Sequence, residues 1–314
     1  MRIALVGDLH LRNRAPEGRR EQDFFSEVQL PKLKQIFDIA DSEQCDCILQ
    51  AGDWWDHPDP SKKLQAECIE LLKNRKRPIP VFTVAGQHDM IGHSLSSISR
   101  SVLRIMEAAG VVRILNSVPI QFENTYFYGA SFGAEVPNPT SFPAILVIHA
   151  LIGNKKLYPN QIIEHPRAFA SKHPNYSLIL VGDCHYRFSY STKASNTFIV
   201  NPGCLVRLAR NRDENLKPAI YVFDINPPQS TLTEHLLNVK PNTEVFFPMK
   251  EIVEREFQFS EFIEQLQKGG EIGINFELNL QQYLDKYNVP RNIRDLISSA
   301  MERIVRVEKE SNHV

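Results

Sequence analysis

Two nearly identical phrases, VGDLH at residues 6–10 and VGDCH at 181–185, each place an aspartate and a histidine just after an apolar run. Three other apolar runs end in GDWWD, GQHD and IHA. Ligands of open α/β sheets bind beyond the carboxyl ends of strands, so we expect the side chains at these five ends to form one site. The residues concerned are Asp8, His10, Asp53, Asp56, Gln87, His88, Asp89, His149, Asp183 and His185.

Imidazole and carboxylate groups in one site indicate a metal centre. This mixture suits Mn²⁺, Fe or Zn²⁺ better than Mg²⁺ or Ca²⁺, which favour oxygen ligands alone. Two ions about 3.5–4 Å apart would hold both sides of an in-line attack on phosphorus and supply a hydroxide nucleophile. Each motif alone is more often a simple turn or a core histidine, and only the combination of all five favours a metal pair.

The fold that would bring these motifs together is a layered α/β fold, because short β-rich runs alternate with segments of helical period. Residues 119–132 alternate in polarity around Asn124 and predict a β-hairpin. Amphipathic helices are expected over residues 33–40, 64–72 and 98–106. Strands are expected at 3–6, 47–49, 81–84, 145–148, 178–181 and 198–200, and two more follow at 219–225 and 231–239.

A domain boundary is expected near Lys240, where the composition changes around the stretch VKPNTEVFFPMK. Residues 1–240 would form the catalytic domain. Residues 241–314 would form a small α/β or helical domain that could bind a partner or DNA. Helices are expected in it over 260–267 and 292–308.

The order of the motifs resembles that of the calcineurin-like metallophosphoesterases, which is D-x-H, G-D-x-x-D, G-N-H-D/E, a later histidine and G-H-x-H. The resemblance covers roughly residues 1–202. It implies two packed mixed β-sheets flanked by helices, and a pair of divalent metal ions. Asp8, His10 and His185 would hold the first ion.

The same resemblance implies roles for four further residues. Asp53 would bridge the two ions, and His149 would bind the second. His88 would protonate the leaving oxygen or contact the phosphate, and Asp56 would orient the His88 imidazole. A carboxylate beside an imidazole selects its tautomer and raises its basicity, which suits that pairing.

Two positions depart from the family pattern, and both belong to the second metal. The asparagine of G-N-H-D is Gln87 here, and the first histidine of G-H-x-H is Asp183. We expect both side chains still to bind. The second site would then be harder and would accept Mn²⁺ or Mg²⁺ more readily than Zn²⁺.

Within the family, the stretches GDLHL, GDWWDHPDPS and NPGCLVRL are most similar to the SbcD-type DNA repair exonucleases of bacteria and phages. This similarity implies a Mn²⁺-dependent exo- or endonuclease that works with an SbcC-like coiled-coil ATPase, and a homodimer is possible. A basic surface for DNA would come from arginines near the strand ends, namely Arg12, Arg14, Arg19, Arg20, Arg187, Arg207 and Arg210. Trp54 and Trp55 would either stack on a base or, as we favour, pack in the core.

Composition limits the possible functions and locations. The net charge of −1 gives the chain no overall attraction for nucleic acid. Five cysteines without a C-x-x-C spacing indicate reduced thiols in the cytoplasm, and no apolar run is long enough to cross a membrane. Two alternatives to a nuclease stay open: a nucleotide phosphatase or small-molecule phosphodiesterase, and a scaffold protein with an impaired metal site.

Overall fold

A computed structural model of the chain divides into two compact units, Met1–Val245 and Phe246–Val314. The structure describes residues 1–16, 18–154, 163–192, 197–208, 217–226 and 229–248, and a few residues between 284 and 297. The helix expected over 260–267 and most of the one expected over 292–308 lie outside the described residues. The separate C-terminal domain therefore stays a prediction.

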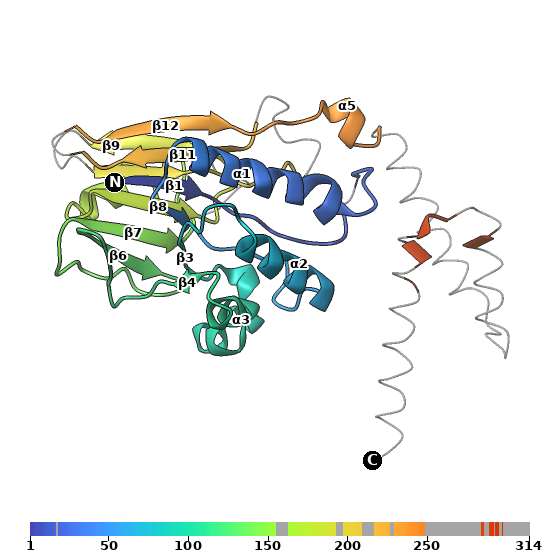
Figure 1. Cartoon of the computed structure of the whole chain (residues 1–314), viewed down its shortest axis with the longest axis horizontal. Coiled ribbons are helices and arrows are strands. Elements are labelled where there is room, and N and C mark those ends of the chain that lie inside the picture. The colour runs from blue at the N-terminus through green and yellow to red at the C-terminus, as the bar shows by residue number, and fades with distance from the viewer. Residues whose placement is uncertain are drawn as a thin grey trace, which may run out of the picture. The chain divides into compact units, whose positions relative to one another are not determined.

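Two six-stranded sheets form the centre of the first unit (Figure 1). The first sheet has the order β12 (Thr231–Leu236), β11 (Ala219–Asp224), β1 (Arg2–Val6), β2 (Cys47–Gln50), β3 (Val81–Thr83) and β4 (Arg113–Ile114). Strands β1 to β4 are parallel, and β11 and β12 extend the sheet in antiparallel pairing.

The second sheet is also mixed. Its order is β5 (Ile120–Phe122), β6 (Thr125–Ala130), β7 (Ala144–His149), β8 (Leu178–Gly182), β10 (Thr197–Asn201) and β9 (Phe188–Thr192). The strands from β6 to β10 are parallel, and β5 and β9 form antiparallel edges. Strands β5 and β6 pair up to Phe122 and Thr125, which confirms the hairpin expected around Asn124.

The inner strands are buried on both faces, which is why their sequences are almost wholly apolar. In β1, Ile3 and Leu5 pack between the two sheets with residues such as Leu180 of the second sheet. Ala4 and Val6 point the other way and pack with the helices. This alternation follows from the two-residue period of a strand.

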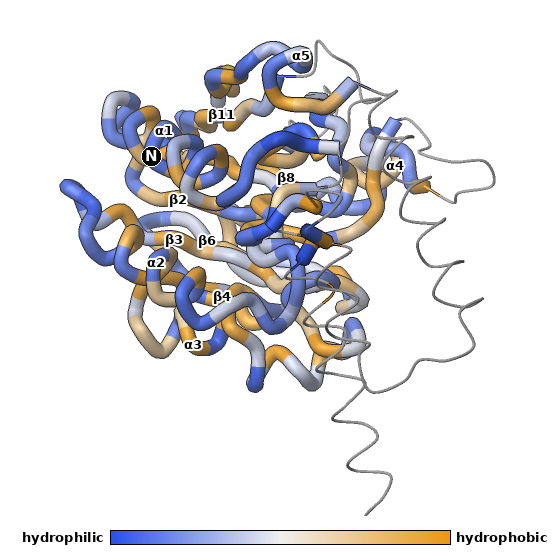
Figure 2. Tube along the Cα trace, turned by 90° about the vertical axis from the view of Figure 1, so that its right-hand side faces the viewer, coloured by the Kyte–Doolittle hydropathy of each residue, from blue (hydrophilic) through white to orange (hydrophobic). Residues whose placement is uncertain are grey.

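Helices cover both outer faces. α1 (Leu30–Ser42), α2 (Lys62–Lys73) and α3 (Val102–Ala108) lie along the first sheet, as Figure 2 also shows, and α4 (Pro166–Lys172) packs on the second. A one-turn helix, α5 (Asn242–Val245), ends the first unit. Helix, sheet, sheet and helix layers confirm the predicted fold class. Within the described residues, no helix is both long enough and apolar enough to span a membrane.

The helix expected over 98–106 begins later than predicted. The side chain of Ser101 accepts a hydrogen bond from the Arg104 amide and caps α3 at its first turn. Residues 95–100 form a 3₁₀ turn instead. Serine competes for backbone hydrogen bonds and favours such a cap over a helix interior.

Candidate metal centre

The candidate site lies where strands of both sheets end. β1, β2 and β3 of the first sheet, and β7 and β8 of the second, lead directly into the five motifs. Three of the candidate ligands have left-handed backbone conformations: His10 has φ +44°, Asp53 has φ +49° and Asp183 has φ +78°. Such conformations are rare for residues other than glycine, and they are found where a site requires a particular side-chain direction.

Two glycines provide the space for these side chains. A Cβ atom on Gly86 would lie 2.1 Å from Oδ1 of Asp53. A Cβ atom on Gly182 would lie 2.6 Å from Nδ1 of His149 and 2.8 Å from Oδ1 of Asp8. Each of these two glycines is therefore required by close packing against the ligand groups of a neighbouring motif.

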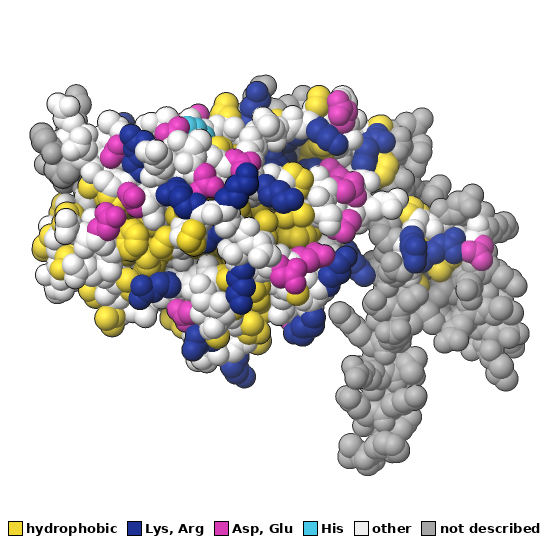
Figure 3. Space-filling model, in the orientation of Figure 1, with side chains coloured by type: hydrophobic (Ala, Val, Ile, Leu, Met, Phe, Trp, Pro, Cys, Tyr) yellow, Lys and Arg dark blue, Asp and Glu magenta, His cyan; other side chains and the backbone are white. Residues whose placement is uncertain are grey.

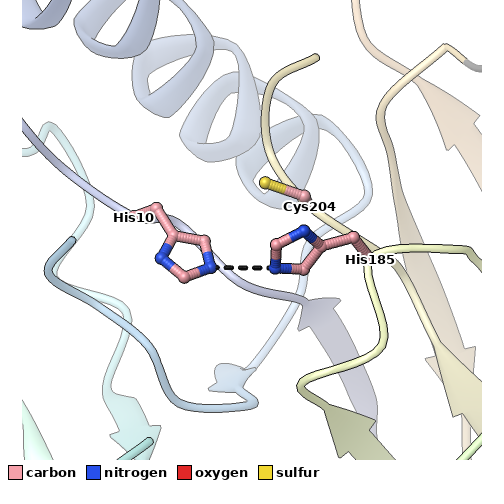
Figure 4. A group of neighbouring side chains, drawn as sticks. All are labelled: His10, His185 and Cys204. Atoms are coloured by element: carbon pink, nitrogen blue, oxygen red, sulfur yellow. Dashed lines mark hydrogen bonds between the residues drawn. The ribbon is translucent and has the colours of Figure 1, made fainter. Parts of the chain in front are cut away.

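One group of side chains forms around the two V-G-D-x-H phrases. The Nε2 atoms of His10 and His185 are 3.0 Å apart (Figure 4), and Oδ2 of Asp8 is 3.7 Å from Nε2 of His185. The main-chain amide of Asp183 donates to both carboxylate oxygens of Asp8, at 3.3 and 3.1 Å. The two phrases, far apart in sequence, thus meet at one place.

Asp53 lies between this group, which contains His10, and a second group of ligands, which contains His149. Its Oδ2 atom is 3.6 Å from Nε2 of His10 and 3.4 Å from Nε2 of His149. His149 donates from Nδ1 to the Ala51 carbonyl oxygen at 2.6 Å, and this bond directs Nε2 toward Asp53. A carboxylate between two imidazoles of different groups has the position of a bridging ligand.

The two residues that depart from the family pattern also meet here. The side-chain amide nitrogen of Gln87 donates to Oδ1 of Asp183 at 2.9 Å. The Gln87 amide oxygen is buried and has no hydrogen-bond partner. The Gln87 amide oxygen could thus bind a cation. The Gln87 amide nitrogen holds Asp183, which replaces the histidine of the family pattern.

Unpartnered polar atoms test whether a metal would fit. In the described part of the chain, four buried atoms at this site have no hydrogen-bond partner: His10 Nδ1, Asp53 Oδ2, Gln87 Oε1 and His149 Nε2. Buried polar atoms are nearly always satisfied, so such a concentration needs a partner from outside the chain. Carboxylate and amide oxygens and neutral imidazole nitrogens carry lone pairs that a divalent ion accepts. The donor set fits metal binding.

The charges at the site favour a cation as well. Burial raises the pKa of Asp8 well above its ordinary value, because a charged carboxylate loses its hydration there. Burial would lower the pKa of His149, but the nearby Asp53 and Asp8 carboxylates outweigh it and raise that pKa to about 10. Burial would also raise the pKa of Asp53, but His149 and His10 reverse the shift and lower it. The carboxylates therefore attract positive charge to their centre.

The contact between Asp56 and His88 differs from the sequence prediction. The Asp56 carboxylate was expected to orient the imidazole, but the Asp56 main-chain oxygen makes the contact, 2.9 Å from Nδ1 of His88. The carboxylate instead forms an ion pair with Arg12. A guanidinium group is a strong partner for a carboxylate. The Asp56 carboxylate still lies within 4.8 Å of ligand atoms of His10 and His88.

Asp89 has a structural position that its motif did not reveal. Its carboxylate accepts hydrogen bonds from the amides of Trp54 (3.2 Å), Trp55 (2.9 Å) and Gly86 (2.9 Å). Burial, together with the charge of Asp53, raises the pKa of Asp89 to about 7. Asp89 joins the GDWWD turn to the GQHD turn. Both tryptophans are buried, as the favoured interpretation of the sequence predicts.

Two glutamines also support the site and were missed. Gln50, at the end of β2, donates to the Gly7 and Gly52 carbonyls at 3.0 and 2.5 Å and accepts from the Gly52 amide at 3.0 Å. Gln29 donates to the His10 carbonyl at 2.8 Å. A polar residue ending the apolar run CILQ was a usable signal for Gln50. No local pattern marks Gln29.

The arginines predicted to contact DNA divide into three groups. Arg14 and Arg20 are exposed, and Arg12 and Arg187 are half-buried in ion pairs with Asp56 and Glu234. The third group, Arg19 and Arg207, is buried. Arg210 lies outside the described residues.

The two buried arginines connect loops of the protein. Arg19 pairs with Glu21 at 2.6 Å and donates to the Arg207 carbonyl oxygen. Arg207 donates to the Asn242 side chain and the Lys240 carbonyl. Because their guanidinium groups are used in these contacts, we do not assign them to a DNA surface.

Fold and site together define a class: a layered α/β domain with a candidate centre for a pair of cations at its strand ends. Residues 1–149 match the Calcineurin-like phosphoesterase family, and the chain carries a metallophosphoesterase domain of that family, as its motifs predict. Members of the family use a pair of divalent metal ions.

Its relatives are distant. The DNA double-strand break repair protein Mre11 of Sulfolobus acidocaldarius is 25% identical over 206 residues, which are 60% of this chain and 50% of that protein. The protein of that name from Sulfurisphaera tokodaii is 28% identical over 192 residues, or 54% and 46%. The chain spans about half the length of the curated relatives it matches. The crystal structure of TT1561 of Thermus thermophilus has a TM-score of 0.46 and 14% identity, covering 74% of this chain and 97% of that one.

Proposed function

We propose that this protein is a metal-dependent phosphodiesterase that cleaves DNA, with Mn²⁺ as an activating ion. The metallophosphoesterase domain and the distant similarity to proteins named for DNA double-strand break repair support the proposal. One observation carries it. Carboxylates and imidazoles of several motifs converge, and buried atoms of these groups have no hydrogen-bond partner in the described chain. The proposed metal ligands are Asp8, His10, Asp53, Gln87, His149, Asp183 and His185.

The two metal ions, when bound, would neutralise the charge of the phosphate and activate a water molecule to attack phosphorus. His88 is proposed to protonate the leaving oxygen. A carbonyl oxygen can only accept, so the contact with Asp56 places a proton on Nδ1 of His88. Nε2 is then the ring atom that can serve the substrate. The His88 main-chain amide donates to Oδ1 of Asp53 at 2.9 Å, which fixes His88 relative to the proposed bridging ligand.

Exposed Arg14 and Arg20, in the loop that follows the first motif, are proposed to contact the DNA backbone. Elsewhere the charges are mixed: on the face drawn in Figure 3, Lys and Arg side chains alternate with Asp and Glu. Binding would therefore depend on a few arginines near the metal centre, and it would weaken steeply with salt.

We also propose a coiled-coil ATPase of the SbcC type as a partner, which the similarity of GDLHL and NPGCLVRL to SbcD-type exonucleases favours. The unit Phe246–Val314 would carry the contact. A neighbouring gene for a long coiled-coil ATPase, and copurification of its product with the full chain but not with one ending at Val245, would support this. Equal copurification of both would contradict the assignment of that unit.

The function is tested with labelled single-stranded and duplex DNA and a chromogenic phosphodiester, each with and without Mn²⁺. We expect Mn²⁺-dependent cleavage of DNA. His88→Ala should lower the rate by about 10²–10⁴-fold, which is the usual contribution of a general acid. A matched control is His165→Ala, which changes an exposed histidine before α4.

Three results would decide between the functions considered. DNA cleavage that His88→Ala abolishes supports the nuclease. Hydrolysis of the chromogenic diester without DNA cleavage would replace it with a small-molecule phosphodiesterase. Inactivity on every substrate with every divalent ion would leave a scaffold protein.

A further inference from the structure

A cysteine lies beside the first group of candidate ligands and is not part of the motifs that predicted them. His10, His185 and Cys204 each offer one ligand atom, and the three atoms lie within 4.8 Å of one another. In Figure 4 the Cys204 sulfur lies beside the two imidazoles, whose Nε2 atoms face each other. Cys204 is buried, with 9% of its surface exposed.

A second observation marks the same place as a binding site. Oδ2 of Asp53 is buried, has no hydrogen-bond partner and lies 3.6 Å from Nε2 of His10. The Asp8 carboxylate is also close, at 3.7 Å from Nε2 of His185. Cys204 packs with the apolar core on one side. Its sulfur also lies beside two imidazoles that are themselves close to two carboxylates.

The backbone on both sides of Cys204 is held by hydrogen bonds. Before it, the Asn201 side chain accepts from the Gly203 amide at 2.6 Å. After it, the Leu205 amide donates to the Asp8 carbonyl at 2.8 Å, which joins the NPGCL turn directly to the first motif. A ligand fixed on both sides needs little rearrangement to bind an ion.

We propose that Cys204 is a sulfur ligand of the first metal site, and that it makes this site prefer thiophilic ions such as Zn²⁺, Fe²⁺ or Co²⁺ over Mn²⁺ or Mg²⁺. This inference rests on the metal pair of the proposed function. The cysteine would bind as the thiolate, with its proton released to solvent. Thiolate ligands select softer ions than carboxylates do.

The two sites would then differ in kind. The second site has the Gln87 amide oxygen and the Asp183 carboxylate, which suit a harder ion such as Mn²⁺. The first would have sulfur and two imidazoles beside the Asp8 carboxylate. Added Mn²⁺ would fill the second site while a thiophilic ion stays in the first, so we infer a mixed pair of metals.

Cobalt absorption spectra of the metal-depleted full chain, titrated with Co²⁺ under reducing conditions, test the inference without an activity measurement. Sulfur bound to Co²⁺ gives a strong charge-transfer band in the near ultraviolet, and nitrogen or oxygen ligands give only weak visible bands. We expect the strong band in the native chain and its loss in Cys204→Ser, which should keep the visible bands.

The matched control is Cys184→Ser, in the second V-G-D-x-H phrase. The Cys184 sulfur lies 2.9 Å from where a Cβ on Gly153 would be, so it packs against that backbone. Cys184→Ser should keep the strong band. Circular dichroism would show that both variants are folded. If Cys204→Ser proves unfolded, Cys204→Ala replaces it in the same comparison.

Competition between metals gives a second measurement. Cys204→Ser should weaken Zn²⁺ binding by about tenfold or more relative to Mn²⁺ binding, because even changes behind the direct ligands cost about 10–100-fold. A native chain that binds Co²⁺ with visible bands alone, or a strong band that survives Cys204→Ser, would overturn the role of Cys204 and leave the proposed function standing. Failure to bind Co²⁺ at all would overturn both.

Discussion

At the scale of single residues, the site depends on strained backbone conformations and on glycines that allow close packing. His10, Asp53 and Asp183 adopt left-handed conformations, and Gly86 and Gly182 leave room that a methyl group would fill. These are positions where ligand groups of different motifs meet. The strain is the cost of bringing several carboxylates and imidazoles into one small volume.

Gly86→Ala directly tests the close packing of Gly86 against Asp53. The new Cβ would meet Oδ1 of Asp53 at 2.1 Å, so Asp53 must move away from its position between His10 and His149. We expect the affinity for metal, measured from bound metal per chain at several metal concentrations, to fall about tenfold. Gly133→Ala is the control: it has open space and φ +78°, so it should cost about 1 kcal/mol of stability and leave metal binding unchanged.

Lys32 offers a residue-scale prediction about pH. Its ammonium group is buried in α1, donates to the Asn238 carbonyl at 2.7 Å and lies near Arg207 and Arg19. Burial, aided by these two charges, lowers the pKa of Lys32 from 10.5 to about 8. Between these values the unfolded chain binds more protons than the folded one, so the contribution of Lys32 to stability rises with pH.

The measurement is the free energy of unfolding of the native chain and of Lys32→Met from about pH 7 to 10.5. Native stability should rise relative to the variant by up to about 3 kcal/mol between about pH 8 and 10.5. Below about pH 8 the difference should be constant. A constant difference over the whole range would show that Lys32 keeps its ordinary pKa.

At the scale of elements, the strand ends depend on polar side chains that join one turn to the next. Asp89 binds three amides from two motifs. Gln50 bonds to Gly7, Gly52 and, through its oxygen, Thr83 at 2.5 Å. These buried bonds replace the regular ladder where the parallel strands separate. They make the turns rigid before any ion binds.

Gln50→Leu should therefore loosen the turns after β1 and β2. The leucine would fill a similar volume but leave the Gly7 and Gly52 groups without partners, which should lower the free energy of unfolding by about 2–4 kcal/mol. Metal affinity should fall as well. Denaturant unfolding would measure the first effect. Gln121→Leu, at an exposed position of β5, should change stability by less than about 0.5 kcal/mol.

At the scale of the whole molecule, the near-neutral charge decides how DNA could be held. With a net charge of −1, attraction must come from local arginines near the metal centre. The structure separates the predicted arginines that it describes into exposed ones, ones half-buried in ion pairs, and buried ones that connect loops. Arg14 and Arg20 remain as proposed contacts.

Arg14→Ala and Arg20→Ala should each weaken DNA binding similarly for all sequences and reduce the slope of log affinity against log salt by about 1. Arg104→Ala, which removes an exposed arginine that pairs with Glu107 on α3, is the control and should change neither. Fluorescence anisotropy at several salt concentrations measures both quantities. Equal slopes for all three variants would remove these arginines from the proposed surface.

The sequence by itself determined the layered fold and the set of strand-end motifs. Apolar runs such as RIALV specify buried strands. A G-D motif that follows such a run must lie at the carboxyl end of the strand. The sequence predicted that Asp8 and His185 would share one site. They follow strands of different sheets, so their meeting also depends on how the two sheets pack. The family resemblance then supplied the proposed roles.

Only the tertiary structure decided which partners these groups have. It showed the Asp56 carboxylate on Arg12, the buried positions of Arg19 and Arg207, and Cys204 beside the two imidazoles. None of these contacts is local in sequence. Side-chain partners depend on which loops lie side by side, and that is set by the packing of two sheets rather than by the period of any one strand.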